Sequence, residues 1–325
     1  MRPARAVVTG VVLLFAVSAC PFSGPGSASG SPRTLGRLPG GEKILYEHDS
    51  AYNHIVVTED EQGIRCLLFE RDGALQSVVK VEDPDYLELP YVRAMLVGLA
   101  FCEPAGTIPE RVLMVGLGGG TIPRFMRRHF PEMTIHVVEI DPEVVSVAKR
   151  FFGFQEDKRL KVFVQDGRKF IENCKKPYDM ILLDAYSSEN IPYHLATEEF
   201  LKAARKAVTP NGIVVANVWS RFSNPLYDSM VCTYQAVFED LYIFDVEDSG
   251  NKIFAALKRP AVLRKELLVG RAERISQERQ FPYDLGQVVK YGYRRATGRY
   301  FPGEVLKDRR EKTQTGGKKA AGAAG

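Results

Sequence analysis

Between residues 112 and 216, short apolar segments alternate with stretches of helical spacing, and this alternation constrains the fold more than any other feature. The apolar segments are rich in β-branched residues and typical of buried strands; they cover 112–115, 135–138, 160–164, 180–183 and 213–216. The intervening stretches have helical spacing near 122–129, 143–152, 168–173 and 196–208. The sequence therefore predicts an α/β fold: a Rossmann-like, seven-stranded, mostly parallel sheet with helices on both faces, whose last two strands form an antiparallel pair over 242–245 and 253–257.

A small antiparallel β-sheet domain is predicted ahead of this domain. Its four strands are expected over 44–47, 54–58, 64–69 and 75–79, with turn sequences between them. A helix is expected over 86–101 and a charged helix over 264–280. We therefore place the small sheet in residues 42–84 and the α/β domain in residues 85–303.

The first twenty residues have the composition of an export signal. Arg2 and Arg5 precede an apolar run over 6–17, which is too short to cross a bilayer comfortably, and the segment ends at Cys20. This ending resembles a bacterial lipobox, so residues 1–20 are predicted to be the signal peptide of a membrane-anchored lipoprotein with its lipid on Cys20. The alternatives are an ordinary signal peptide or a mis-assigned start, which would leave the protein in the cytoplasm. Residues 21–41 are predicted to be a flexible linker.

The charge of the chain is concentrated at its C-terminus. Residues 305–325 carry six Lys or Arg against two acids, a surplus of four that equals the net charge of +4. The rest of the chain is neutral, which argues against a nucleic-acid groove. We predict a disordered basic tail over 304–325. Four further cysteines lack the spacing of a zinc site, so no metal is predicted and their disulfide state stays open; they are Cys66, Cys102, Cys174 and Cys232.

Four features follow the ends of predicted parallel strands, where open α/β sheets bind ligands. Gly116, Gly118 and Gly120 allow a sharp turn from strand to helix and a close approach of a ligand. Glu139 ends the next strand, where a carboxylate can accept hydrogen bonds from both ribose hydroxyls. Asp166 and Gly167 follow the third strand and can contact an adenine or cap a helix.

Asp184 is the fourth feature. It ends a buried apolar strand, where a carboxylate is costly unless it is paired or functional. The sequence therefore predicts that Asp184 faces the reacting atoms of a bound nucleoside.

Together these motifs resemble the spermidine synthase (polyamine aminopropyltransferase) family over about 46–257. The matching segments are a DGxxQ at 72–76, the glycine loop at 112–120, an EID at 139–141, a DG at 166–167 and a YDxIxxD at 178–184. The resemblance implies a class I S-adenosylmethionine-type fold that transfers an aminopropyl group from decarboxylated S-adenosylmethionine to a small amine, with no metal. It implies Asp184 as the catalytic residue, Gln76 as a nucleoside contact, Tyr91, Tyr186 and Glu189 as amine contacts, and a homodimer.

The amine half of the implied site departs from the family. Gly119 stands where the family usually has an Asp, and Arg93 where it has an acid. The second acid after Asp184 is absent at its usual spacing, and Glu189 is displaced along the loop. Two alternatives therefore stay open: methyl transfer from S-adenosylmethionine on the same fold, and a non-catalytic nucleoside- or polyamine-binding lipoprotein.

Overall fold

The computed structural model describes residues 36–38, 40–102, 107–186, 191–298 and 301–308. The predicted signal peptide with Cys20, most of the predicted linker, and Glu189 lie outside the described residues.

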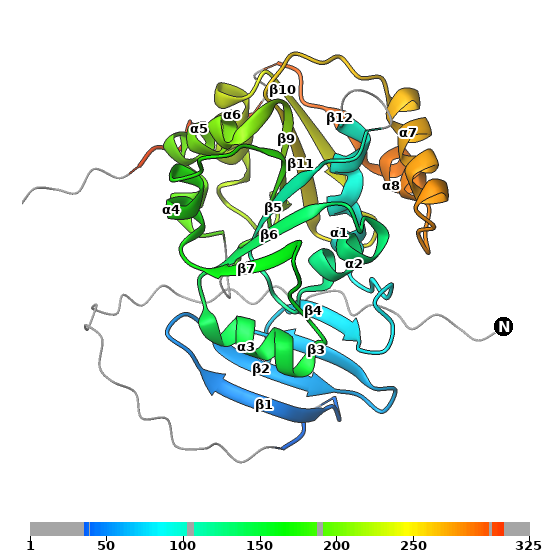
Figure 1. The fold of residues 1–325 in the computed structure, drawn as a ribbon. Helices are drawn as coiled ribbons and strands as arrows, with labels where there is room; N and C mark the ends of the chain where they lie inside the picture. The colour runs from blue at the N-terminus through cyan, green and yellow to red at the C-terminus, as the bar shows by residue number, and fades with distance from the viewer. Residues whose placement is uncertain (1–35, 39, 103–106, 187–190, 299–300, 309–325) are drawn as a thin grey trace, which may run out of the picture. The chain divides into compact units, whose positions relative to one another are not determined.

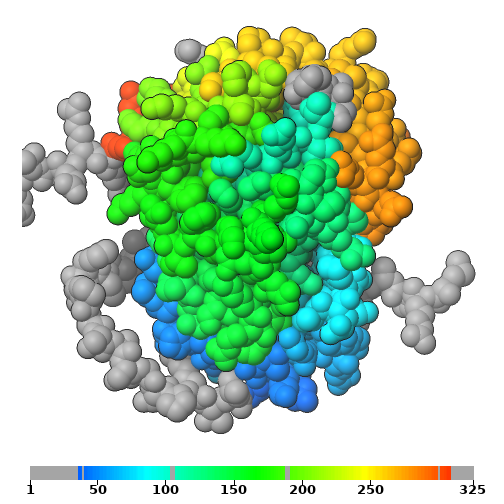
Figure 2. Space-filling model, in the orientation of Figure 1, coloured from blue at the N-terminus to red at the C-terminus, as the bar shows by residue number. Residues whose placement is uncertain are grey.

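The predicted small sheet is present and fully antiparallel, in the order β1-β2-β3-β4. Its strands are β1 (Lys43–Asp49), β2 (His54–Glu59), β3 (Ile64–Leu68) and β4 (Leu75–Lys80). Alternate side chains such as Ile55, Val57 and Leu67 are buried in the same apolar cluster as the larger domain. Figures 1 and 2 show that the blue strands of this sheet pack directly against the green residues of the α/β domain.

The larger sheet has the order β12-β10-β11-β9-β8-β5-β6-β7. Five neighbouring strands are parallel: β5 (Arg111–Val115), β6 (Thr134–Glu139), β7 (Leu160–Val164), β8 (Tyr178–Leu183) and β9 (Val208–Trp219). Antiparallel strands β10 (Asp240–Asp245) and β11 (Asn251–Leu257) extend the sheet beyond β9, as predicted.

The sheet has eight strands rather than the expected seven. The added strand, β12 (Tyr293–Arg295), pairs with β10. Three residues, two of them arginines, carry no alternating apolar pattern, so only the pairing with β10 reveals this strand.

Helices cover both faces of the sheet (Figure 1). One face carries α1 (Pro90–Met95), the 3₁₀ helix Leu96–Phe101, α2 (Thr121–His129), α3 (Pro142–Phe151), α7 (Lys265–Glu278) and α8 (Leu285–Gly292). The opposite face carries α4 (Gly167–Glu172), α5 (Glu198–Ala207) and α6 (Tyr227–Val237). The sequence-based prediction missed α6 and α8.

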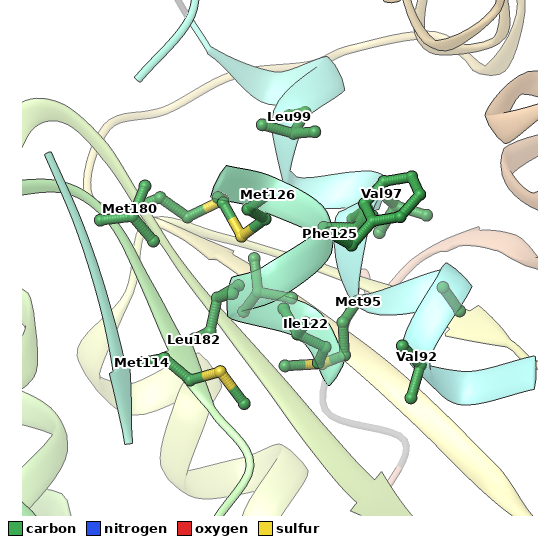
Figure 3. Packing of buried hydrophobic residues seen from close by; sticks show 14 of the residues in the cluster. Val92, Met95, Val97, Leu99, Met114, Ile122, Phe125, Met126, Met180 and Leu182 are labelled. Atoms are coloured by element: carbon green, nitrogen blue, oxygen red, sulfur yellow. The ribbon is translucent and has the colours of Figure 1, made fainter. Parts of the chain in front are cut away.

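The helix expected over 86–101 is shorter and has two parts. Pro90 begins α1, since proline suits the first helical turn, and the chain tightens into the 3₁₀ helix after Met95. A Cβ on Gly98 would lie 2.6 Å from Cγ2 of Val215, so this segment packs very closely on β9. Figure 3 shows Met95, with neighbours from α2, facing Met114 of β5.

The disorder predicted from residue 304 is wrong for residues 304–308. Leu306 is buried, and its carbonyl accepts the N–H of Glu198 at 2.7 Å, at the start of α5. The Asp308 carboxylate accepts two hydrogen bonds from Arg168 of α4, at 2.6 and 2.7 Å. One buried leucine and one ion pair with a distant helix leave no signature in local composition.

No helix in the described part of the chain has the length and apolar character needed to cross a membrane.

Candidate active site

The glycine loop connects β5 to α2 in backbone conformations that L-residues rarely adopt. Gly116, Gly118 and Gly120 have φ angles of +96°, +54° and +75°. A Cβ on Gly116 would lie 2.2 Å from the carbonyl oxygen of Asp184. The loop therefore lies directly against the end of β8 that carries the predicted catalytic acid.

Glu139, at the end of β6, is held rigidly by main-chain donors. Its Oε2 accepts the N–H of Leu117 at 2.9 Å, and its Oε1 accepts the N–H of Asp141 at 3.0 Å. Burial raises the pKa of Glu139, and these main-chain bonds oppose that rise. A carboxylate oxygen can accept more than one hydrogen bond, so each oxygen retains capacity for a ligand hydroxyl. This arrangement fits the predicted ribose contact.

The side chain of Asp166 caps α4. Helix capping is one of the two roles predicted for this residue from sequence; the other is contact with an adenine. Its Oδ1 accepts the N–H of Lys169 at 2.9 Å. Its Oδ2 lies 3.1 Å from Nε2 of His194, a residue of the 3₁₀ helix Tyr193–Leu195. A Cβ on Gly167 would lie 2.4 Å from Cγ1 of Val115, so α4 begins in close contact with the end of β5.

Asp184 is half-buried at the carboxyl end of β8. Its main-chain N–H donates to the Val115 carbonyl at 2.9 Å, and its Oδ1 accepts Nδ2 of Asn217 at 2.9 Å. Burial raises the pKa of Asp184 to about 7, although the bond from Asn217 acts in the opposite direction. This carboxylate can therefore exchange a proton near neutral pH, as a general base must.

Two tyrosines lie beside Asp184. Burial raises the pKa of Tyr91 and of Tyr186 well above the usual value, and the nearby charge of Asp184 adds to both shifts. Their phenols stay neutral donors: Tyr91 donates to the Gln76 carbonyl at 3.2 Å and Tyr186 to the Asn217 carbonyl at 2.8 Å. The ring of Tyr186 also stacks on Trp219, with centroids 5.5 Å apart.

The other residues singled out in the sequence take less direct positions. The side chain of Gln76 donates to the Ala74 carbonyl at 3.2 Å, and it is the main chain of Gln76 that holds Tyr91. The guanidinium of Arg93 donates to the Leu87 carbonyl at 2.7 Å. Within the described residues, no group of three or more His, Cys, Asp or Glu side chains could hold a metal ion.

Sequence reasoning missed Ser77 and Asn217. The Ser77 hydroxyl accepts the N–H of Gly119 at 2.8 Å and ties the small sheet to the glycine loop. Its position next to Gln76 in the DGxxQ segment was the available signal. Asn217 is a buried polar residue in an apolar strand, the same signal that identified Asp184.

Comparison with known proteins agrees with this geometry. A family model described as the spermine/spermidine synthase domain matches residues 90–242. A polyamine aminopropyltransferase from Vibrio vulnificus is 38% identical over 234 residues, which cover 70% of this chain and 75% of that protein. The chain belongs to the spermidine synthase family.

The chain is similar to solved structures of two kinds, a probable spermidine synthase and a methyltransferase-like protein. A probable spermidine synthase from Corynebacterium glutamicum matches 83% of this chain and 99% of its own, with 20% identity and a TM-score of 0.66. The human methyltransferase-like protein 13, solved in complex with SAH, matches 60% of this chain and 94% of its own, with 31% identity and a TM-score of 0.55.

Proposed function

We propose that this protein transfers an aminopropyl group from decarboxylated S-adenosylmethionine to an amine, with Asp184 as the general base. One observation carries the proposal: a carboxylate with a pKa of about 7 lies against the glycine loop, next to Tyr91. Family membership supports the same reaction.

The nucleoside half of the site has the groups that such a substrate needs. Glu139 would accept the ribose hydroxyls, and Asp166 would contact the adenine through its Oδ2, which His194 also contacts. The glycine loop keeps side chains away from the space above β5. These residues fit an adenosyl group of either decarboxylated S-adenosylmethionine or S-adenosylmethionine.

Asp184 would orient the acceptor and take its proton. The bound nucleoside supplies a carbon activated by a sulfonium; the carbon–sulfur bond breaks as a carbon–nitrogen bond forms. The leaving sulfur becomes a neutral thioether, so it needs no acid and no metal. Near neutral pH the acceptor amine is protonated and has no free lone pair, so it must lose a proton before it attacks, and Asp184 accepts that proton. Tyr91 and Tyr186, both neutral, would line the acceptor's path without competing for that proton.

The acceptor is proposed to be a small amine with few positive charges. The described side chain that hydrogen-bonds Asp184 is the neutral Asn217, and Gly119 offers no carboxylate to a second ammonium group. A polyamine needs several carboxylates to compensate its charges.

Glu139→Gln is expected to weaken nucleoside binding. The amide would turn its NH₂ group toward a main-chain N–H, of Leu117 or Asp141, and lose one acceptor oxygen. We expect affinity for decarboxylated S-adenosylmethionine to fall roughly 10- to 100-fold. Isothermal titration calorimetry measures this loss, with Glu61→Gln on an exposed turn as the matched control. Failure of the wild-type protein to bind either nucleoside would contradict the proposal.

Methyl transfer is the second candidate, favoured by the 31% identity to the SAH-bound human methyltransferase structure. The reaction products separate the two. Aminopropyl transfer releases methylthioadenosine and adds an aminopropyl group to the amine, whereas methyl transfer releases S-adenosylhomocysteine and adds a methyl group. Mass spectrometry of parallel reactions with the two nucleosides decides between them.

The reaction rate is expected to rise with pH through about 7 and then level off. Because the pKa of Asp184 is raised to about 7, the carboxyl is protonated and inactive as a base below that pH. The rate should therefore fall about tenfold for each unit of pH below the midpoint. A pH profile of kcat at saturating nucleoside measures the limb; a midpoint near the ordinary Asp value would contradict the role of Asp184.

A further inference from the structure

Asp184 stands at the end of a series of hydrogen bonds that begins in the turn before β11, a strand two positions away from β8 in the sheet. Strands β9 and β11 are antiparallel neighbours (Figure 1). In their register Asn251 is opposite Trp219, and Ile253 is opposite Asn217. Asn251 and Asn217 are thus diagonal neighbours on one face of the sheet. Nδ2 of Asn251 donates to Oδ1 of Asn217 at 2.8 Å, and Nδ2 of Asn217 donates to Oδ1 of Asp184 at 2.9 Å.

The series of hydrogen bonds continues into the turn before β11. The hydroxyl of Ser249 donates to Oδ1 of Asn251 at 2.6 Å, and the main-chain N–H of Asn251 donates back to the Ser249 hydroxyl at 3.2 Å. Asp248 precedes Ser249 with a φ of +51°, so the turn is tight. The serine therefore fixes which way the amide of Asn251 faces.

All the side-chain hydrogen bonds in this series have the same donor-to-acceptor direction, toward Asp184. Ser249 donates to Asn251, Asn251 to Asn217, and Asn217 to Asp184. An amide has its donors and its acceptor on opposite sides. Because Asn251 occupies the oxygen of Asn217, the NH₂ group of Asn217 must face the carboxylate. The reversed amide would direct an oxygen at Asp184 and repel its charged form.

Asn217 also contacts a second side chain of the site. Its main-chain carbonyl accepts the hydroxyl of Tyr186, and the residue is almost fully buried, with 3% exposed. The titratable groups beside Asp184 are Tyr91 and Tyr186, both of which stay neutral. Among the described residues, the bond from Asn217 is thus the side-chain hydrogen bond that stabilises the carboxylate form of Asp184.

We propose that Asn251, supported by Ser249, is a positioning residue: it orients the amide of Asn217 so that Asp184 is held in place and kept as a carboxylate. The proposal rests on the proposed function, in which Asp184 is the base. It adds two residues that lie outside the motifs shared with the family and that are linked to Asp184 through Asn217.

Asn251→Asp is the decisive variant, because it keeps the shape of the side chain and removes its donor. A carboxylate at position 251 accepts the NH₂ group of Asn217, which turns the oxygen of Asn217 toward Asp184. We expect the pKa of Asp184 to rise by roughly one unit. At pH 7 kcat should then fall roughly fivefold and recover at pH 9, with nucleoside affinity unchanged.

The pKa of Asp184 is measured without turnover, from the carboxyl ¹³C shift in the ligand-free protein, assigned by its loss in Asp184→Asn. This titration decides the proposal even if no amine proves to be an acceptor, so its failure is distinguishable from failure of the proposed function. In the Asn217→Ala background, Asn251→Asp should produce a clearly smaller shift, since the intermediary is absent and only the repulsion by the added charge remains.

Two further variants separate orientation from charge and folding. Glu247→Gln changes the charge of the same turn at an exposed position and should leave the pKa of Asp184 unchanged. Asn251→Ala removes the donor without adding a charge and should shift the pKa in the same direction as Asn251→Asp, by less. A folded Asn251→Asp protein with an unchanged pKa of Asp184 would overturn the proposal, as would an equal shift in the Asn217→Ala background.

Discussion

Replacing Asp184 by Asn is expected to abolish turnover while nucleoside affinity stays within about twofold. The amide keeps the shape of the side chain but cannot accept the proton that the amine must lose. We expect kcat to fall roughly 10²- to 10⁴-fold, the range that general bases contribute. The acidic limb of the pH profile should disappear from the residual activity, because that limb reports the titration of Asp184.

Asp179→Asn is the matched control, since Asp179 lies on the same strand, β8, near its opposite end. Its Oδ2 accepts the N–H groups of Glu110 and Arg111, both at 3.0 Å, so it supports the start of β5. This variant should lower the free energy of unfolding by about 1 kcal/mol and leave kcat of the folded protein unchanged. Single-turnover kinetics and denaturant unfolding measure both effects. Equal activity of Asp184→Asn and the wild type would refute the role of Asp184.

The positions of four proposed site residues could be predicted from sequence because each of them follows or ends a strand that carries its own apolar pattern. Parallel strands end at one edge of the sheet, so Gly116, Glu139, Asp166 and Asp184 are brought to that edge by topology alone. The order of the strands and their apolar pattern therefore determine which residues meet at this edge, without knowledge of how the side chains pack.

The supporting residues could not be predicted in the same way, because their partners are distant in sequence. Asn217 and Asn251 are 34 residues apart, and only the register of β9 on β11 makes them neighbours. Ser77, in the small sheet, is hydrogen-bonded to Gly119 of the glycine loop, 42 residues away in sequence. Such contacts depend on the packed structure, whereas local pattern specifies only the strands that bear them.

The packed segment 304–308 was mistaken for disorder for a related reason. The segment continues into residues 309–325, whose polar and basic composition is typical of a solvated tail. Its order comes from Leu306 between α5 and α6 and from the pairing of Asp308 with Arg168. A single apolar residue is too little for a periodic signal, although burying it stabilises the segment by about 2 kcal/mol.

Gly116→Ala is expected to have the largest effect on stability of any conservative substitution in the glycine loop. At a φ of +96° an alanine is strained, and its Cβ would lie 2.2 Å from the carbonyl oxygen of Asp184 and 2.8 Å from the carbonyl carbon. These are main-chain atoms, so the collision cannot be relieved by a rotamer change. We expect a loss of about 2–5 kcal/mol in the free energy of unfolding, the sum of backbone strain and overpacking.

Gly63→Ala separates the two contributions to this loss. Gly63 has a φ of +75° in a turn of the small sheet, and a Cβ there would meet no atom within 4 Å. That variant should lose only the conformational part, about 1–2 kcal/mol. The additional loss in Gly116→Ala measures the contact between the glycine loop and the end of β8. Because relieving that contact displaces Asp184, the folded fraction of Gly116→Ala should also lose turnover, which Gly63→Ala should retain. Equal losses of stability in the two variants, measured by urea unfolding, would show that the loop and the catalytic strand are not in the tight contact on which the arrangement of the site depends.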